Sequence, residues 1–319
     1  MKNVRLPWKY GIAVLVLLAA VLIPGIKAES ATAYKLIEYY QVYQSEMAEE
    51  RFQSGNYYFY TNMLSTGAEQ VYAAKTKTAK GKLLYKTTAE APHISNMLAN
   101  DTYVFYAVGN AAGTAYTIYR NTLTGSGTAK KITTVKCSAD GEFLLWSATA
   151  GNIYYTLNYN GQQRLYACKI STGKNTRMAT DLYVEATNGR YLYMSAYADE
   201  YVLHVFDCKT AKMVNQMKKS NLQESVTKVY VYSDRVYAVT EYLKTNGITT
   251  YTVRQYKLNG TGGKKVTTIS KEGASIGDVT KYYVYYAVDG GDGTVTYYRY
   301  NQSAGSTGKV TAANYKDTW

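Results

Sequence analysis

The chain has 319 residues, a formal net charge of +13, and 37 tyrosines against five phenylalanines. The charge comes from scattered lysines at predicted turns rather than from Lys/Arg blocks, which argues against a nucleic-acid partner. The three cysteines are an odd number and lack the close spacing of a disulfide framework or a zinc site. Many glycines and tyrosines with only three prolines favour an all-β protein rich in turns.

Residues 1–28 have the features of an export signal. A basic flank ends at Lys9, residues 11–23 form an almost pure apolar run, and Pro24-Gly25 would end a helix there. The apolar run is shorter than the roughly 20 residues that a membrane-spanning helix needs. We expect a signal peptide cleaved after Ala28 and a secreted or cell-surface protein. The alternative is an uncleaved signal-anchor, which would be the only membrane attachment that we expect.

Residues 29–46 are a separate N-terminal segment that mixes helix and strand signals. Its glutamates favour a solvated helical turn, whereas its tyrosines would suit a strand. The sequence therefore leaves open a short helix or a closing strand ahead of the repeats.

A short aromatic strand recurs six times at starts 38 to 50 residues apart, and it defines a repeat. Five of the six copies directly follow Gly or Asp, which supplies a turn in front of the strand. The copies are NYYFY from Asn56, TYVFYA from Thr102, NIYYT from Asn152, RYLYM from Arg190, RVYAV from Arg235 and YYVYYA from Tyr282.

Three further strands complete each repeat. The aromatic strand leads into a strand that ends at a glycine- or lysine-rich corner, and a shorter strand follows, such as KKITTV from Lys130. The last predicted strand of each unit precedes the next aromatic strand: 47–53, 93–98, 143–148, 182–186, 226–232 and 274–279. Several strands read as continuous apolar runs, which is typical of strands buried on both faces. We predict a six-bladed β-propeller of four-stranded blades over residues 47–319, because a β-sandwich would not repeat one aromatic strand six times.

The turn with its aromatic strand (Gly151 to Tyr155) and the L-x-G-x-G corners (Leu123 to Gly127, Leu258 to Gly262) resemble a known family. They resemble the YWTD-type propellers of lipoprotein receptors and, more closely, the secreted bacterial propellers called DUF5050. The resemblance covers about residues 47–313. No intact YWTD tetrapeptide occurs, so it implies the fold rather than a receptor function. It also implies that residues 93–98 and their equivalents line a central channel.

Residues with catalytic or metal-binding chemistry are few. His93 and His204 lie in different repeats without a nucleophile motif, and we interpret both as packed histidines. Asp289 to Gly293 could form a calcium loop, but a hairpin turn explains the same residues. We predict no catalytic constellation, no metal and no cofactor.

We predict a non-enzymatic binding module at the cell surface whose partner is an envelope polysaccharide or protein. Tyrosines at turns are the candidate ligand contacts, namely Tyr159, Tyr197 and Tyr242. The alternative is a propeller-type glycan hydrolase or lyase, which would need two carboxylates. Glu185 and Asp278 are the acids that fall on predicted channel strands beyond the first repeat.

The sequence predicts that Cys168 and Cys208 occupy the same position in neighbouring repeats, since each comes two residues after an aromatic residue and directly before a lysine. Equivalent positions in neighbouring blades are too far apart for a disulfide. We therefore predict buried, free thiols that behave as small apolar groups.

Overall fold

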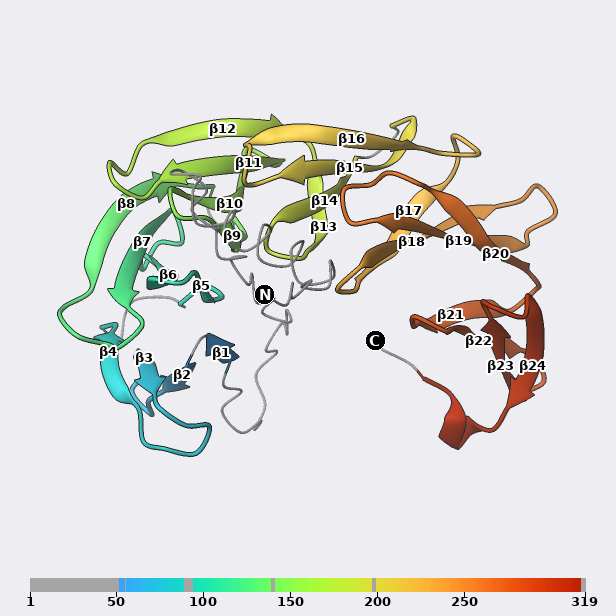
Figure 1. Ribbon diagram of the computed structural model, residues 1–319, viewed down its shortest axis with the longest axis horizontal. Helices are drawn as coiled ribbons and strands as arrows, with labels where there is room; N and C mark the ends of the chain where they lie inside the picture. Colours follow the sequence, from blue (N-terminus) through green and yellow to red (C-terminus); the bar gives the residue numbers. More distant parts are fainter. Residues whose placement is uncertain (1–51, 55, 89–93, 139–140, 197–198, 317–319) are drawn as a thin grey trace, which may run out of the picture. The chain divides into compact units, whose positions relative to one another are not determined.

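The structure is a computed structural model that describes residues 52–54, 56–88, 94–138, 141–196 and 199–316. Within these ranges the chain forms six four-stranded antiparallel sheets, and in each sheet the strands follow one another in sequence order (Figure 1). One 3-10 turn, η1 (Ala312–Asn314), follows the last strand. In the part of the chain that is described, no helix is long and apolar enough to cross a membrane. The predicted six-bladed β-propeller of four-stranded blades is confirmed.

The twenty-four strands of the described ranges fall into four equivalent sets, one strand of each set per sheet. The first strands are β1 (Phe52–Ser54), β5 (Leu98–Ala99), β9 (Phe143–Ala148), β13 (Tyr183–Thr187), β17 (Ser225–Val231) and β21 (Ala274–Val279). The second, aromatic strands are β2 (Tyr57–Met63), β6 (Tyr103–Gly109), β10 (Asn152–Tyr159), β14 (Tyr191–Ser195), β18 (Arg235–Leu243) and β22 (Tyr283–Asp289).

The third strands are β3 (Glu69–Ala74), β7 (Ala115–Thr122), β11 (Gln162–Lys169), β15 (Tyr201–Asp207), β19 (Thr249–Lys257) and β23 (Val295–Asn301). The fourth strands are β4 (Lys82–Lys86), β8 (Lys130–Lys136), β12 (Asn175–Thr180), β16 (Lys212–Lys218), β20 (Lys264–Ser270) and β24 (Ser306–Val310). The predicted residues 143–148 and 274–279 match β9 and β21 at both ends.

In the second to fifth sheets, both faces of the aromatic strand are buried between consecutive sheets. On β6, Val104 and Tyr106 pack into a core shared with the first sheet, whereas Phe105 and Ala107 pack into a core shared with the third. All four side chains are fully buried. Burial on both faces removes the need for alternation, which explains the continuous apolar runs in the sequence.

The first strands of neighbouring sheets converge, as the contacts of β5 with β9 and of β13 with β17 show. The fourth strands lie at the opposite edge of each sheet, and Figure 1 shows β8, β12, β16 and β20 along the outside. The side that the first strands share is therefore the inner side of the sheets.

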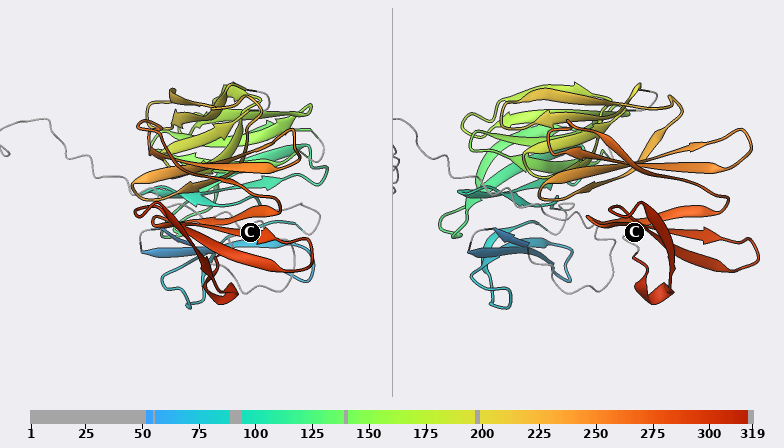
Figure 2. Two further views of the ribbon diagram at one scale, coloured as in Figure 1. Left: turned by 90° about the vertical axis from the view of Figure 1, so that its right-hand side faces the viewer. Right: turned by 45° about the vertical axis from the view of Figure 1, so that its right-hand side comes forward.

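The strands of each sheet run between two ends, seen from the side in Figure 2. At one end, here called the corner end, the first strand leads to the second and the third to the fourth. At the opposite end the second strand leads to the third, and the fourth leads to the next sheet. Two hydrogen bonds between neighbouring sheets show that their corner ends lie on the same side of the molecule. The Tyr154 hydroxyl donates to the carbonyl of Cys208 at 2.7 Å, and the Tyr193 hydroxyl donates to the carbonyl of Leu258 at 2.8 Å.

The C-terminal residues pack on the sixth sheet. The ring of Tyr315 lies 4.6 Å from that of Tyr297 and 6.4 Å from that of Tyr285, measured between centroids. A Cβ atom at Gly277 would lie 2.2 Å from the Tyr315 hydroxyl oxygen. Glycine at this position of β21 thus leaves the room that the tyrosine needs.

The predicted equivalence of Cys168 and Cys208 is wrong by two residues. Cys168 pairs with Ile153 on the aromatic strand, and the residue that pairs with the corresponding Leu192 is Phe206. Cys208 instead corresponds to Ile170, because the amide of each donates to the residue before the aromatic strand. Side chains two residues apart on a strand point to the same face of the sheet. A shift of two residues in the alignment of the repeats therefore leaves both cysteines on the expected face, and the sequence pattern does not reveal it. All three cysteines are buried and free in the structure.

Candidate functional site

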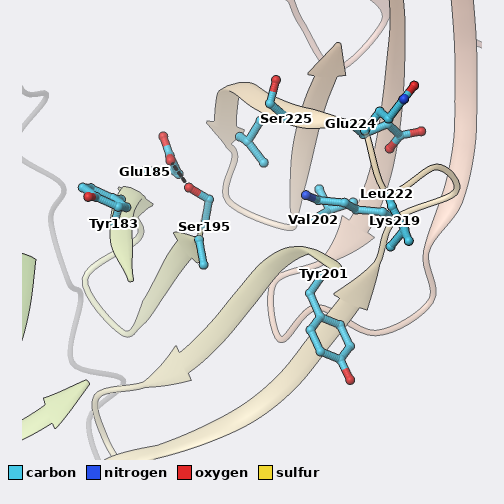
Figure 3. A pocket seen from close by; sticks show the side chains of 12 residues that line it. Tyr183, Glu185, Ser195, Tyr201, Val202, Lys219, Leu222, Glu224 and Ser225 are labelled. Carbon is cyan, nitrogen blue, oxygen red and sulfur yellow. Dashed lines mark hydrogen bonds between the residues drawn. The ribbon is translucent and has the colours of Figure 1, made fainter. Parts of the chain in front are cut away.

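A pocket of about 630 Å³ lies between the fourth and fifth sheets, at the end opposite the corners. Tyr183, Glu185 and Ser195 form one side, whereas Leu222, Lys219 and Glu224 lie on the other (Figure 3). The remaining lining residues are Ala196, Tyr201, Val202, Gln223, Ser225 and Val226. The pocket thus brings together β13, the end of β14, the start of β15 and the connection 219–224.

A β-bulge positions Glu185 in this pocket. On β13, Val184 pairs with Met194 and Ala186 pairs with Tyr193, so Glu185 is an extra residue without its own partner. A bulge turns a side chain out of the regular alternation of a strand. The bulge recurs on three other first strands, β9, β17 and β21, at Trp146, Thr227 and Gly277. Within this repeated feature, the fourth sheet is the one that places a carboxylate.

The carboxylate of Glu185 accepts a hydrogen bond from the Ser195 hydroxyl group. Solvent reaches the side chain, yet the protein around it excludes enough water to raise the pKa of Glu185 above its usual value, although the Ser195 bond opposes this shift. The pair therefore offers a ligand both an acceptor and a hydroxyl group at the pocket wall.

The remaining walls are amphipathic. Tyr183 is 44% exposed and Leu222 is 74% exposed, so both present apolar surface to solvent. Lys219 adds a half-buried ammonium group. An exposed ring beside hydrogen-bonding groups suits a ligand with both apolar faces and hydroxyl groups.

The second carboxylate of the pocket, Glu224, is held in a buried ion pair. Its Oε1 atom lies 2.9 Å from Arg254 Nη2, and its Oε2 atom accepts a bond from the Thr240 hydroxyl at 3.2 Å. The side chains of Glu224 and Arg254 are 3% and 8% exposed. Both oxygens of Glu224 are thus engaged, and its role is to fix the connection 219–224 against β19.

His204 is buried beside this region and both of its ring nitrogens have partners. Gln216 Nε2 lies 3.1 Å from Nδ1, and Asp199 Oδ2 lies 2.5 Å from Nε2. Because the Gln216 amide donates to Nδ1, the Nε2 proton is directed at Asp199. Burial opposes the lowered pKa of Asp199, but the bonds from His204 and the Tyr201 amide outweigh it. His204 has no nitrogen left for a nucleophile, as expected of a packed histidine.

The tyrosines that the sequence singled out lie elsewhere. Tyr159, at the end of β10, is half-buried and has the Arg164 guanidinium 4.6 Å from its ring centroid. Tyr242 is half-buried on β18, opposite Thr250. Tyr197 and His93 fall outside the described residues. Neither Tyr159 nor Tyr242 lines the pocket, and their contact with a ligand stays a prediction.

The two predicted channel acids are both on first strands but do not share the pocket. Glu185 lines it, whereas Asp278 is 6% exposed on β21 of the sixth sheet. Sequence reasoning missed Glu224, Lys219 and Leu222. Arg254, a charged residue in the middle of strand β19, was the signal that could have pointed to a buried acid nearby.

The described residues contain no group of three or more His, Cys, Asp or Glu side chains placed to hold a metal ion. The residues Asp289 to Gly293 connect β22 and β23 as the hairpin that the sequence indicated. Asp289 accepts a bond from the Gly291 amide at 2.9 Å, and Asp292 accepts from the Thr294 amide at 2.9 Å. Both carboxylates thus support the turn itself.

No family model matches the sequence, and no curated protein matches it. Among solved structures, the uncharacterized protein lmo1340 from Listeria monocytogenes EGD-e is similar at 9% identity and a TM-score of 0.48, over 85% of this chain and 84% of that one. An oligogalacturonate lyase in complex with manganese is similar at 10% identity and a TM-score of 0.47, over 80% and 74% of the two chains. The β-propeller domain of the Trilobed protease from Pyrococcus furiosus is similar at 14% identity and a TM-score of 0.47, over 84% of each.

The six sheets define the class of protein: a six-bladed β-propeller. Identities and TM-scores this low carry no argument about a ligand or a reaction.

Proposed function

We propose that the protein is an exported, non-enzymatic binding module that holds a saccharide segment of an envelope polysaccharide in the pocket between the fourth and fifth sheets. The exposed ring of Tyr183 beside the Glu185–Ser195 pair is the observation that supports this most directly. A sugar has apolar C–H faces and a rim of hydroxyl groups, so it can stack on the ring while its hydroxyls bond to the pair. Export rests on the basic and apolar segment of residues 1–28.

The carboxylates of the pocket favour binding of a ligand over catalysis. Glu224 has both carboxylate oxygens engaged, so among the described lining residues Glu185 is the one carboxylate that still faces the pocket. Hydrolysis of a glycosidic bond needs two cooperating carboxylates. A pocket with one such group can recognise a sugar without cleaving it.

The protein is first tested for binding to an array of envelope polysaccharides and wall-polymer fragments. A glycan that binds is then titrated into the protein in a calorimeter to measure its affinity. Tyr183→Ala should weaken that affinity roughly tenfold, because the ring supplies the stacking surface. Tyr282→Ala is the matched control, since Tyr282 is 62% exposed at the corner end. The proposal would be contradicted if the chain bound envelope proteins but no glycan, or if the wild type and Tyr183→Ala bound the glycan with equal affinity.

A second candidate function, a glycan hydrolase or lyase, is favoured by one observation. The raised pKa of Glu185 is a property of catalytic general acids. Glu185→Gln separates the two functions, because glutamine keeps a bond with Ser195 but cannot donate an acidic proton. Turnover of envelope glycans, measured as new reducing ends or unsaturated products, that disappears in Glu185→Gln would establish the enzyme. A binding module shows no turnover in either protein.

A further inference from the structure

The connections between third and fourth strands carry a concentration of lysines that the pocket does not use. The segments 75–82, 123–131, 169–174, 208–212 and 257–265 contain four, two, two, two and three lysines, thirteen in all, and no aspartate or glutamate. All thirteen lysines are exposed. Five of the six sheets thus have an uncompensated basic corner.

The lysines keep the same place in each of these five sheets. Lys82, Lys130, Lys212 and Lys264 are the first residues of β4, β8, β16 and β20, and Lys174 directly precedes β12. Equivalent positions in equivalent sheets lie at the same end, so these side chains all emerge at the corner end.

Close contacts show that successive corners adjoin. A Cβ atom at Gly173, in the third corner, would lie 2.3 Å from the carbonyl oxygen of Ile132, which follows Lys131. A Cβ atom at Gly260, in the fifth corner, would lie 2.8 Å from Val205 of the fourth sheet. Both glycines also have positive φ angles, of 69° and 81°. The two glycines therefore seat the third corner on the second sheet and the fifth corner on the fourth, which brings the basic corners of these neighbouring sheets close together.

The few acids of the corner end are already paired or isolated. Asp207 binds Arg190 at 3.1 Å and Asp234 binds Arg235 at 2.6 Å, so arginines rather than the corner lysines neutralise them. Asp101, in the turn before β6, is exposed. The opposite end has a different balance, with Glu142, Asp181, Glu200, Glu272 and Asp292 exposed in its connections.

Protection of sheet edges explains only part of this distribution. Lysines on an edge strand discourage pairing with another chain, and they can do so anywhere along that strand. Lysines within the connections, such as Lys75, Lys77 and Lys80, guard no edge. Edge protection also gives no reason for the missing acids.

We propose that the basic corners form a second binding site, for a linear polyanion that passes from corner to corner. Lysine binds phosphate and carboxylate groups as a flexible point charge, and threonine and serine in the same corners can donate to their oxygens. Peripheral membrane binding combines charge with apolar insertion. The exposed large hydrophobic side chains near the corners, Leu83, Met213, Val214 and Tyr282, are few and belong to three different sheets. The lysines instead recur in five sheets, which favours a soluble or wall-bound polymer over a lipid surface.

Three strands of the chain supply a matched test. Lys82, Lys130 and Lys212 begin β4, β8 and β16 at the corner end, whereas Lys86, Lys136 and Lys218 end the same strands at the opposite end. All six are exposed, so the triple variants Lys82→Glu/Lys130→Glu/Lys212→Glu and Lys86→Glu/Lys136→Glu/Lys218→Glu change the net charge equally. They differ in which end of the sheets loses its lysines.

The probe is linear polyphosphate, titrated into the full chain at low and moderate salt. We expect the corner variant to bind on the order of a hundredfold more weakly than the wild type, and the opposite-end variant to bind within a few fold of it. The affinity of the wild type should fall steeply as salt rises. Equal losses in the two variants would show a response to net charge alone and overturn the site.

A lipid arm completes the experiment. Vesicles of phosphatidylcholine with and without phosphatidylglycerol measure binding to an anionic bilayer, and residues 1–28 are identical in all variants. The proposal of a polymer would be overturned in favour of a membrane if the protein bound the anionic vesicles more tightly than polyphosphate and the corner variant lost that vesicle binding. Tyr183→Ala should leave polyphosphate affinity unchanged, so failure of this inference and failure of the saccharide pocket are distinguishable.

Discussion

The interface between the second and third sheets and that between the fourth and fifth are built from equivalent strands but differ in content. The former contains a run of stacked rings: Phe143 lies 4.8 Å from Tyr116 and 5.0 Å from Tyr155, which in turn lies 5.4 Å from Tyr166. The latter has mostly smaller aliphatic side chains beside two tyrosines in its core, and a buried ion pair, Glu224 with Arg254, at one end.

The difference shows how one repeat can both hold the fold together and leave room for a ligand. Large rings fill space efficiently and stabilise by burial. An ion pair stabilises little after its desolvation cost, but it fixes the backbone that carries it. At the fourth and fifth sheets the pair holds the connection 219–224 in place, and the outer side chains of that connection line the pocket.

The largest expected effect is loss of the ion pair. Arg254→Met leaves Glu224 buried without its cation, and we expect the free energy of unfolding to fall by about 3–5 kcal/mol. Denaturant unfolding measures this. Arg235→Met is the control, because Asp234 and Arg235 are 45% and 26% exposed, and solvent screens their pair so that its loss should cost far less. Adding Glu224→Gln to Arg254→Met should restore part of the loss; equal losses in the two arginine variants would contradict a special role for the buried pair.

A smaller loss is expected in the stacked interface. Phe143→Leu keeps an apolar side chain but removes two ring contacts and some volume, so we expect a loss of about 2 kcal/mol. The same denaturant experiment measures it. Saccharide affinity at the pocket should not change, whereas Arg254→Met should reduce it even under conditions where that variant is folded. If Phe143→Leu weakens the ligand as much as Arg254→Met, the two interfaces are not independent.

Replacing the buried cysteines tests the two interfaces that flank the third sheet, and each replacement should lower the free energy of unfolding by roughly 1 kcal/mol. Cys168 packs between the second and third sheets, Cys208 between the third and fourth, and each alanine variant should cost about that amount in lost packing. Burial raises the pKa of Cys168 to about 11 and that of Cys208 to about 12, so neither should be alkylated in the native protein. Mass spectrometry after alkylation checks this, and a peptide linking the two cysteines would contradict the fold.

The strand pattern could be predicted from the sequence because it depends on local chemistry. Turn residues ahead of aromatic runs mark the second strands, and β9 and β21 follow at regular spacing. The register within a strand could not be fixed to better than two residues, since a shift of two keeps each side chain on its face. The misplaced Cys208 is the result.

The pocket depends on features that local sequence does not report. The bulge at Glu185 exists only because β13 pairs with β14 in a particular register. The connection 219–224 reads as an ordinary polar turn until Arg254, thirty residues later, draws Glu224 inward. Long-range pairing of this kind is decided by the packed sheets rather than by any window of the sequence.

The smallest expected effect concerns Glu185 and pH. Its pKa is raised in the folded protein, so the folded state holds the proton more tightly than the unfolded chain does. As pH rises through the ordinary range of a glutamate, the unfolded chain loses its proton first, and the wild type loses stability relative to Glu185→Gln. This loss stops above the raised pKa. The difference in unfolding free energy between wild type and variant should therefore shift steadily towards the variant from acidic to neutral pH.

Asp292→Asn is the control with the opposite sign, because bonds from Thr294 lower the pKa of Asp292. The wild type should therefore gain stability relative to Asp292→Asn as pH rises. A flat difference for Glu185→Gln across this range would show that its carboxylate is hydrated like a surface group, and the pocket would then lack the protein environment that sets the fourth sheet apart.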